Sequence, residues 1–126
     1  MKKTIILCDE NPAYSEPIKD RIEYSNFPVN VLCAHTHTEA VSLVPENESC
    51  LIITNSAIPG EGIKNPTDGA IALLKNSKAK NAKCRVILYA PPFLEIEKSG
   101  FDVYINSLHH DSFNKLFDRI CLFCKN

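Results

Sequence analysis

The chain has 126 residues, of which 44% are hydrophobic and 23% are charged, a balance typical of one globular domain. Fourteen lysines and arginines stand against fifteen aspartates and glutamates, which gives a formal net charge of −1. Cations are not in excess, and no apolar run approaches the roughly 20 residues that span a bilayer, so neither a nucleic-acid nor a membrane partner is expected. The apolar run that begins at Thr4 stops at Asp9-Glu10, short of the roughly 7–15 residues of a secretory signal. We therefore expect a single cytoplasmic domain over residues 1–126.

Apolar runs and helix-like spacings alternate along the chain. Apolar, β-branched runs predict five strands buried on both faces, at residues 4–8, 29–34, 50–54, 85–89 and 102–105. Apolar residues three and four apart, together with capping residues, prolines and Gly100, predict five helices, at residues 12–26, 38–44, 68–76, 91–98 and 113–124.

Prolines, capping residues and polar segments indicate where the predicted helices begin and end. Pro17 conflicts with an uninterrupted first helix, so this helix either begins near Ser15 or is kinked. Thr38 is the expected cap of the second helix, and Asp111 or Ser112 is that of the last. The glycines and prolines of residues 55–67 predict a long loop, and the polar residues 75–83 predict a frayed helix end and a linker.

Alternating strands and helices predict a three-layer α/β sandwich with a parallel sheet. For five strands we expect the flavodoxin-like order 2-1-3-4-5, flanked by five helices. A site would then open where the first and third strands end, beside Asp9-Glu10 and Asn55-Ser56. The acidic pair either binds Mg²⁺, which prefers carboxylate and carbonyl oxygens, or is solvated and caps the first helix.

The six cysteines are expected to pack as small apolar residues of a reducing compartment. Cys121 and Cys124 form a CxxC pair at the end of the last predicted helix, whereas a redox-active pair lies at a helix N-terminus, where the dipole lowers the thiol pKa. A redox or metal role for this pair stays open. His35 and His37 are either a metal-binding pair or ordinary loop histidines.

Several short motifs together resemble the receiver domain of two-component response regulators, the chemotaxis-regulator-like family. They are Asp9-Glu10 after the first strand, Asn55 to Gly60 after the third, Asp68-Gly69, Leu88-Tyr89-Ala90 and Gly100 to Ile105. The resemblance covers essentially the whole chain.

The resemblance assigns a role to each motif. Asp9 and Glu10, with the carbonyl of Ala57, match the Mg²⁺ ligands. Asn55, four residues before Pro59, stands where the family has its phosphoacceptor Asp. The remaining family positions are the switch hydroxyl, where Tyr89 stands before the expected Ala90, and the lysine, where Asn106 and Ser107 stand.

The departures concern three parts of one mechanism. An amide cannot form the acyl phosphate that a carboxylate forms, the lost lysine would have stabilised phosphoryl oxygens, and no small hydroxyl occupies the switch position. The chain is therefore expected to be a degenerate pseudo-receiver that is not an enzyme, has no catalytic residue, requires no cofactor and binds Mg²⁺ weakly at most.

Three functions follow from this pattern. The first is a phosphorylation-independent module that binds a protein of a two-component pathway. The second is a receiver that is still phosphorylated weakly with Mg²⁺, at Thr54, Ser56 or deamidated Asn55. The third, flavin or nucleotide binding, is disfavoured because Asp9-Glu10 would repel phosphate.

The partner surface implied by the resemblance also allows a homodimer. It is the face built from the helix at 91–98, the strand at 102–105 and the last helix. Four side chains are its candidates: Phe93, Tyr104, His109 and His110.

Overall fold

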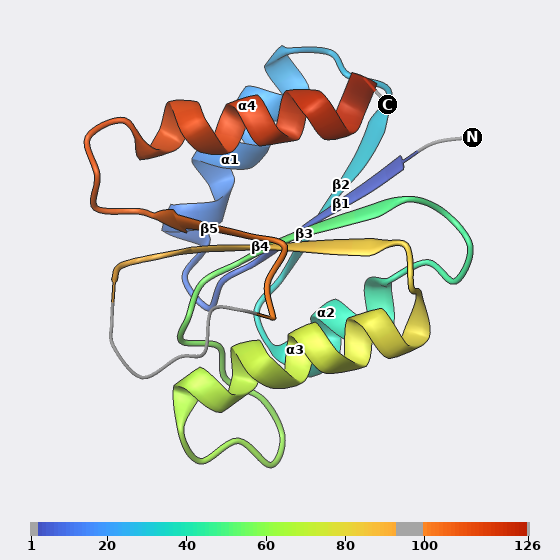
Figure 1. Ribbon diagram of the computed structural model, residues 1–126, viewed down its shortest axis with the longest axis vertical. Helices are drawn as coiled ribbons and strands as arrows, with labels where there is room; N and C mark the ends of the chain where they lie inside the picture. Colours follow the sequence, from blue (N-terminus) through green and yellow to red (C-terminus); the bar gives the residue numbers. More distant parts are fainter. Residues whose placement is uncertain (1–2, 93–99, 126) are drawn as a thin grey trace.

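A five-stranded parallel sheet forms the centre of the molecule in a computed structural model that describes residues 3–92 and 100–125. The strands lie in the order β2-β1-β3-β4-β5 (Figure 1), which confirms the expected flavodoxin-like arrangement. Their bounds are Lys3–Cys8 for β1, Val29–Ala34 for β2, Cys50–Thr54 for β3, Cys84–Ala90 for β4 and Val103–Asn106 for β5.

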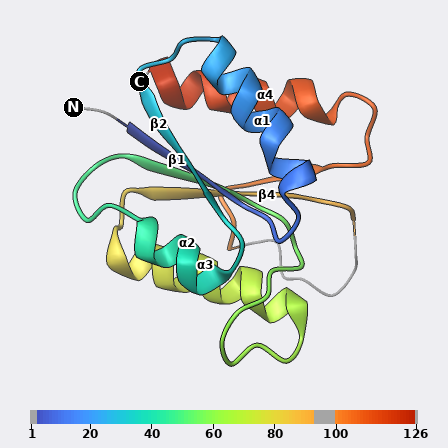
Figure 2. The same ribbon diagram turned by 180° about the vertical axis from the view of Figure 1, so that it is seen from behind.

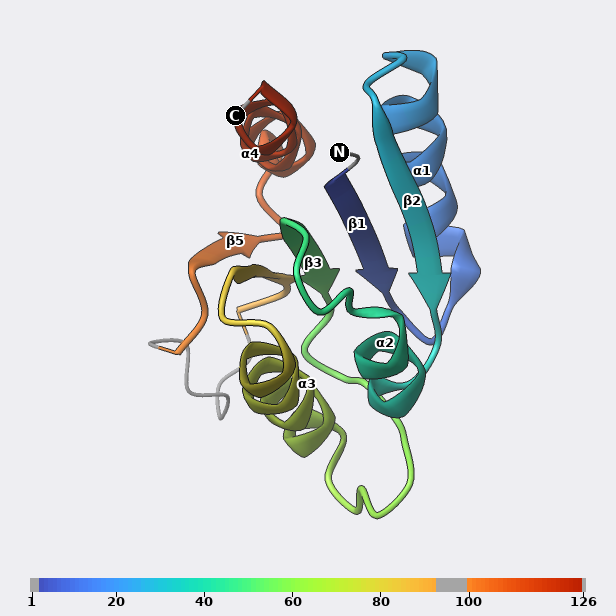
Figure 3. The same ribbon diagram turned by 90° about the vertical axis from the view of Figure 1, so that its right-hand side faces the viewer.

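Helices cover both faces of the sheet. Their bounds are Pro12–Tyr24 for α1, His37–Leu43 for α2, Pro66–Lys80 for α3 and Ser112–Lys125 for α4. Helices α1 and α4 lie on one face and α2 and α3 on the other, as Figures 1 and 2 show from opposite sides. Figure 3 looks along the layers. Four helices are thus seen where five were expected, because the helix predicted at 91–98, with Phe93, falls largely on residues outside the described part.

Helix α1 begins at Pro12, as the range 12–26 predicted, and α2 begins one residue before the expected 38. Helix α1 starts at Pro12 despite Pro17 in its interior, because the side chain of Asn11 accepts a hydrogen bond from the backbone N–H of Ala13 at 3.0 Å. The late start near Ser15 was wrong. Thr38 is not the cap of α2: the hydroxyl of Thr36 accepts from the Glu39 N–H at 3.1 Å instead.

Helix α3 is longer at both ends than the expected 68–76. The side chain of Asn65 accepts from the Thr67 N–H at 3.2 Å and starts the helix inside the predicted loop. The polar stretch after residue 76 continues the helix instead of forming a linker, because its lysines have fixed partners. Lys78 forms an ion pair with Asp102 at 2.9 Å, and Lys80 donates to the Val41 carbonyl at 3.0 Å.

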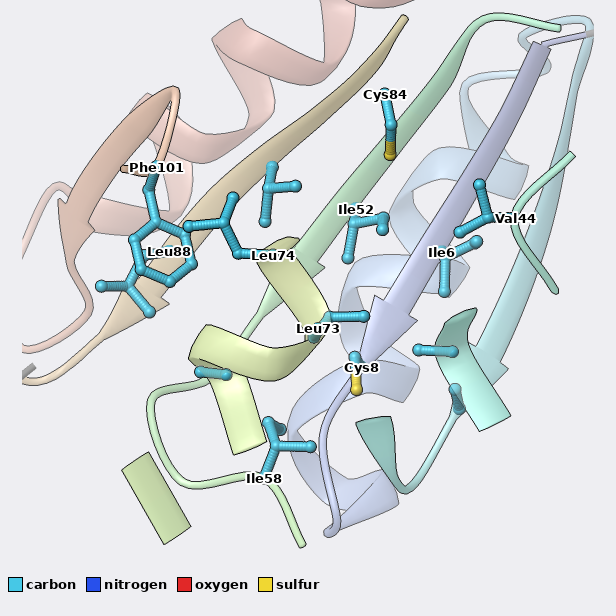
Figure 4. Packing of buried hydrophobic residues seen from close by; sticks show 14 of the residues in the cluster. Ile6, Cys8, Val44, Ile52, Ile58, Leu73, Leu74, Cys84, Leu88 and Phe101 are labelled. Atoms are coloured by element: carbon cyan, nitrogen blue, oxygen red, sulfur yellow. The ribbon is translucent and has the colours of Figure 1, made fainter. Parts of the chain in front are cut away.

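Two hydrophobic clusters fill the spaces between the sheet and its helices. The cluster under α2 and α3 (Figure 4) includes three fully buried cysteines, Cys8, Cys50 and Cys84, which confirms core packing for these thiols. The cluster under α1 and α4 is built from larger side chains, with Cys33 and Cys124 half-buried at its margin. None of the described helices is long and apolar enough to cross a membrane.

Candidate functional site

The backbone places the predicted site residues at the carboxyl edge of the sheet. The N–H of Asp9 donates to the Ala34 carbonyl at 3.0 Å, and the N–H of Asn55 donates to the Cys8 carbonyl at 3.2 Å. These bonds extend the parallel ladders of β1 with β2 and of β1 with β3 by one residue. Asp9 and Asn55 are therefore held at neighbouring strand ends, as expected for a parallel sheet.

Asp9 is a half-buried carboxylate in a mixed environment. Burial raises the pKa of the Asp9 carboxyl most strongly, and the negative charge of Glu10 raises it further. The Asn11 N–H, which donates to Asp9 Oδ1 at 3.0 Å, and hydrogen bonding with the Asn55 side chain lower the pKa, as does the charge of His35. Asp9 and Asn55 thus form one polar cluster, while Glu10 is exposed beside it.

The Asn55 amide is held by its neighbours. Its Oδ1 accepts from the Ser56 N–H at 2.7 Å, and its backbone carbonyl accepts from the Thr54 hydroxyl at 2.9 Å. Thr54 and Ser56 are themselves buried, with 1% and 5% of their surface exposed. The two hydroxyls nearest the acceptor position therefore lie largely out of reach of a phosphodonor in solution.

Tyr89 is tied to the start of α4. Its hydroxyl lies 3.2 Å from Ser112 Oγ, and that hydroxyl in turn donates to the Ser107 carbonyl at 3.1 Å. The N–H of Ser107 donates to the Ala90 carbonyl at 3.0 Å. The switch-equivalent and lysine-equivalent positions are thus joined through Ser112, which the sequence indicated only as a possible helix cap.

Four of the predicted residues surround one cavity of about 400 Å³. Asp9, Asn55, Tyr89 and Ser107 all line it. None of the described residues in its wall is a lysine or arginine, so the positive charge that the family places near the acceptor has no counterpart there.

The other predicted residues have different surroundings. Ala90 is buried in the cluster under α2 and α3, and Asn106 Oδ1 accepts from the Leu108 N–H at 3.0 Å. Ala57 is half-buried in the loop that follows β3.

The acidic pair offers few ligands for Mg²⁺. Within residues 3–92 and 100–125, no three His, Cys, Asp or Glu side chains cluster closely enough to hold a metal ion. Asp9 and Glu10, with the Ala57 carbonyl, would hold the ion only if water supplied the remaining oxygen ligands that Mg²⁺ requires. Because the protein supplies so few ligands, we expect Mg²⁺ to bind only weakly at this site.

The histidines after β2 have separate partners. His35 Nδ1 lies 3.2 Å from the Asp9 carbonyl, whereas His37 is buried and its Nε2 lies 3.3 Å from the Glu61 carbonyl. A Cβ on Gly60 would lie 2.0 Å from the His37 ring, so this ring packs directly under the loop after β3. The partners favour structural roles over a shared metal.

The predicted partner face is only partly described. The Tyr104 hydroxyl donates to the Ala90 carbonyl at 3.3 Å, and the rings of His109 and His110 stack with centroids 4.5 Å apart. The CxxC pair, Cys121 and Cys124, lies free and half-buried in the last turns of α4. Burial raises the pKa of the Cys124 thiol, with a smaller contribution from Cys121.

Comparison with solved structures identifies proteins that share this fold. No family model matches the chain, and no curated protein matches it. Among solved structures, the receiver domain of HemR from Leptospira biflexa is 18% identical with a TM-score of 0.75, over 99% of this chain and 96% of that one. The chain has the receiver fold.

Two further structures support this assignment. The response regulator TrrA from Thermotoga maritima, in complex with Mg²⁺ and BeF, is 17% identical with a TM-score of 0.69, and covers 98% of this chain and 99% of its own. A receiver domain from Pseudomonas fluorescens Pf-5 is 19% identical with a TM-score of 0.72, over 98% of this chain and 88% of that one. At these identities the likeness establishes the receiver fold, and the chemistry must be argued from the residues present.

Proposed function

We propose that this chain is a pseudo-receiver: a receiver-like domain of two-component signalling that binds a protein partner without being phosphorylated and has no catalytic role of its own. The observation that carries the proposal is the amide at Asn55, at the strand end next to Asp9, where receiver domains have the acceptor carboxylate. An amide nitrogen is not a nucleophile because its lone pair is delocalised, and its oxygen forms no stable acyl phosphate.

The surroundings of Asn55 support the same conclusion. The described cavity wall has no cation to stabilise phosphoryl oxygens. The Tyr89 hydroxyl is already within hydrogen-bond distance of the buried Ser112. It would have to break this contact before it could bond to a phosphoryl group at the site. Both the reaction and its read-out would therefore need groups that this site does not offer.

The loss of the lysine fits the electrostatics of the cluster. Three adjacent carboxylates repel one another unless a cation compensates them. With Asn55 in the central position only Asp9 and Glu10 remain, and hydrogen bonds from Asn11 and Asn55 already stabilise Asp9. The site can then persist as a polar patch without lysine or bound metal.

Incubation with acetyl phosphate and Mg²⁺ tests the proposal by intact mass. We expect no adduct of ~80 Da, the mass of one phosphoryl group, on the wild-type chain. Asn55→Asp is the matched variant, and it should acquire a slow adduct because the nucleophile is restored. A stoichiometric adduct on the wild type, mapped by fragmentation to Thr54 or Ser56, would instead establish the weakly phosphorylated alternative.

A further inference from the structure

The cavity beside Asn55 extends well beyond the polar cluster, between α1 and α4. Ile18 of α1, Ile53 of β3 and Phe113 of α4 contribute apolar walls, and Ala13 and Leu108 also line it. A volume of about 400 Å³ falls within the range of roughly 300–1,000 Å³ found for sites that bind small molecules. A predominantly apolar wall with a few polar groups is also typical of such sites.

Polar groups line the cavity where β1 and β3 end, and the only charged side chain among its described lining residues is acidic. Asp9 and Asn55 follow β1 and β3, and exposed Glu10 adds a second negative charge next to Asp9. The described wall contains no lysine or arginine. An anionic ligand would therefore be repelled at this end, whereas a hydrogen-bond donor would find acceptor oxygens.

We propose that this cavity binds a small molecule without negative charge, whose hydrogen-bond donor points toward Asp9 and Asn55 and whose apolar body lies between α1 and α4. The volume and concave shape favour a small molecule over a segment of another chain. The inference goes beyond the proposed function and does not depend on it, because the shape and charge of the cavity are the same whether or not a phosphoryl group can be accepted.

An occupant would connect the site to the partner face. It would contact α1 through Ile18 and α4 through Phe113, and it would lie against Tyr89, whose hydroxyl bonds to Ser112 at the first residue of α4. Binding would therefore restrict the position of α4 relative to α1. Binding of a small molecule at the strand ends would thus change the position of α4 and of the partner face to which it belongs. Receiver domains accept phosphate at the same edge of the sheet.

A titration with 2-naphthol, followed by backbone amide NMR, tests the inference. This probe is neutral near pH 7 and carries one hydroxyl on an apolar body. We expect saturable shifts centred on Ile18, Asn55 and Phe113 with a dissociation constant below about 1 mM. Naphthalene-2-sulfonate, with the same rings and a negative charge, should bind at least about tenfold more weakly.

Two variants place the binding in the cavity. Ala13→Leu adds bulk at an exposed position of the wall and should weaken 2-naphthol binding at least about tenfold. Tyr24→Ala removes an aromatic ring that is 89% exposed at the far end of α1 and should leave binding unchanged; the NMR spectrum of each variant reports directly whether it is folded. Absence of saturable shifts, equal binding of the sulfonate, or undiminished binding by folded Ala13→Leu would each overturn the inference. None of these results bears on phosphorylation, which the mass measurement tests separately.

Discussion

The two faces of the sheet are packed in different ways. Under α2 and α3 the cluster contains many small residues, among them Ala40, Ala70 and Cys8. Under α1 and α4 large aliphatic and aromatic side chains meet, and a cavity of about 400 Å³ remains at the carboxyl edge. The difference indicates that the α2/α3 face holds the strand ends and the loop after β3 in place, while the α1/α4 face carries the space available for binding.

The closest approach on the α2/α3 face gives the largest expected effect. A Cβ on Gly69 would lie 1.8 Å from the carbonyl oxygen of Ile58, a backbone atom that cannot move aside cheaply. We expect Gly69→Val to lower the free energy of unfolding by at least about 3 kcal/mol, measured by urea denaturation.

Gly62 supplies the matched control for this substitution. A Cβ there meets nothing within 4 Å, although its φ of +79° disfavours other residues. Gly62→Ala should therefore cost about 1 kcal/mol. Equal effects at the two glycines would contradict the close packing at Gly69.

Truncation of one large side chain on each face compares the two clusters directly. Leu73 of α3 is fully buried, and Leu73→Ala should lower the free energy of unfolding by about 3 kcal/mol because a new cavity opens in a filled core. Phe113 is half-buried and already borders a cavity, so Phe113→Ala should cost less than half as much by the same urea measurement. A larger loss at Phe113 would show that the α1/α4 face is the more tightly packed one.

The cysteines report the same contrast without mutation. Burial raises the pKa of the Cys8 thiol to about 12, and hydrogen bonding with Cys84, together with burial, raises the pKa of the Cys50 thiol. Because the thiolate is the reactive form, the buried thiols of Cys8 and Cys50 should react with iodoacetamide at pH 8 at least about 100-fold more slowly than the half-buried thiols of Cys33 and Cys121. Peptide mass spectrometry measures the rates, and comparable labelling of both groups would contradict the difference between the faces.

The raised pKa of Cys8 also has a consequence for stability. The folded state keeps this thiol neutral up to about pH 12, whereas the unfolded chain ionises it from its ordinary pKa of 9.0. The stabilising contribution is complete below pH 9 and is lost as the pH rises from there toward 12. A Cys8→Ala variant should therefore show a weaker fall in stability between pH 8 and pH 10 than the wild type.

The smallest expected effect concerns the polar cluster. Asn55→Asp adds a third carboxylate beside Asp9 and Glu10, and its pKa in the folded state should be raised by their repulsion. The variant should lose about 1 kcal/mol at pH 7, the loss should disappear as the pH falls through that pKa, and Mg²⁺ should restore the stability.

The same substitution at an exposed asparagine is the control, because it adds a negative charge away from Asp9 and Glu10. Asn76 is exposed on α3, so Asn76→Asp should leave both the stability and its response to Mg²⁺ nearly unchanged. Identical behaviour of the two variants in urea denaturation would contradict the account of the cluster.

The sequence predicted the strands well and the ends of α3 poorly, for physical reasons. Runs such as Leu51 to Ile53 are apolar on both faces, and the bounds of β2 and β3 agree with the expected 29–34 and 50–54. The start of α3 was missed because the capping residue Asn65 lies among glycines and prolines typical of a loop. Its end was missed because the lysines there bond to distant groups that only the folded chain brings near.

The site was predictable where strand order alone determines position. Asp9, Asn55 and Tyr89 follow or end neighbouring parallel strands, and the structure brings them to one cavity. The link from Tyr89 to Ser112 spans 23 residues, and the contact of Gly60 with the His37 ring joins two loops. Neither contact has a local signal in the sequence, because each depends on how helices and loops pack on the finished sheet.

A titration with Mg²⁺ and beryllofluoride, followed by backbone amide NMR, tests the central claim most directly, because this ion mimics a phosphoryl group on a carboxylate. The account predicts no saturable shift at Asn55 or Tyr89, with at most small Mg²⁺-dependent changes at Asp9 and Glu10. Saturable shifts that begin at Asn55 and spread through Tyr89 and Ser112 into α4 would contradict it and restore a phosphorylation-type switch.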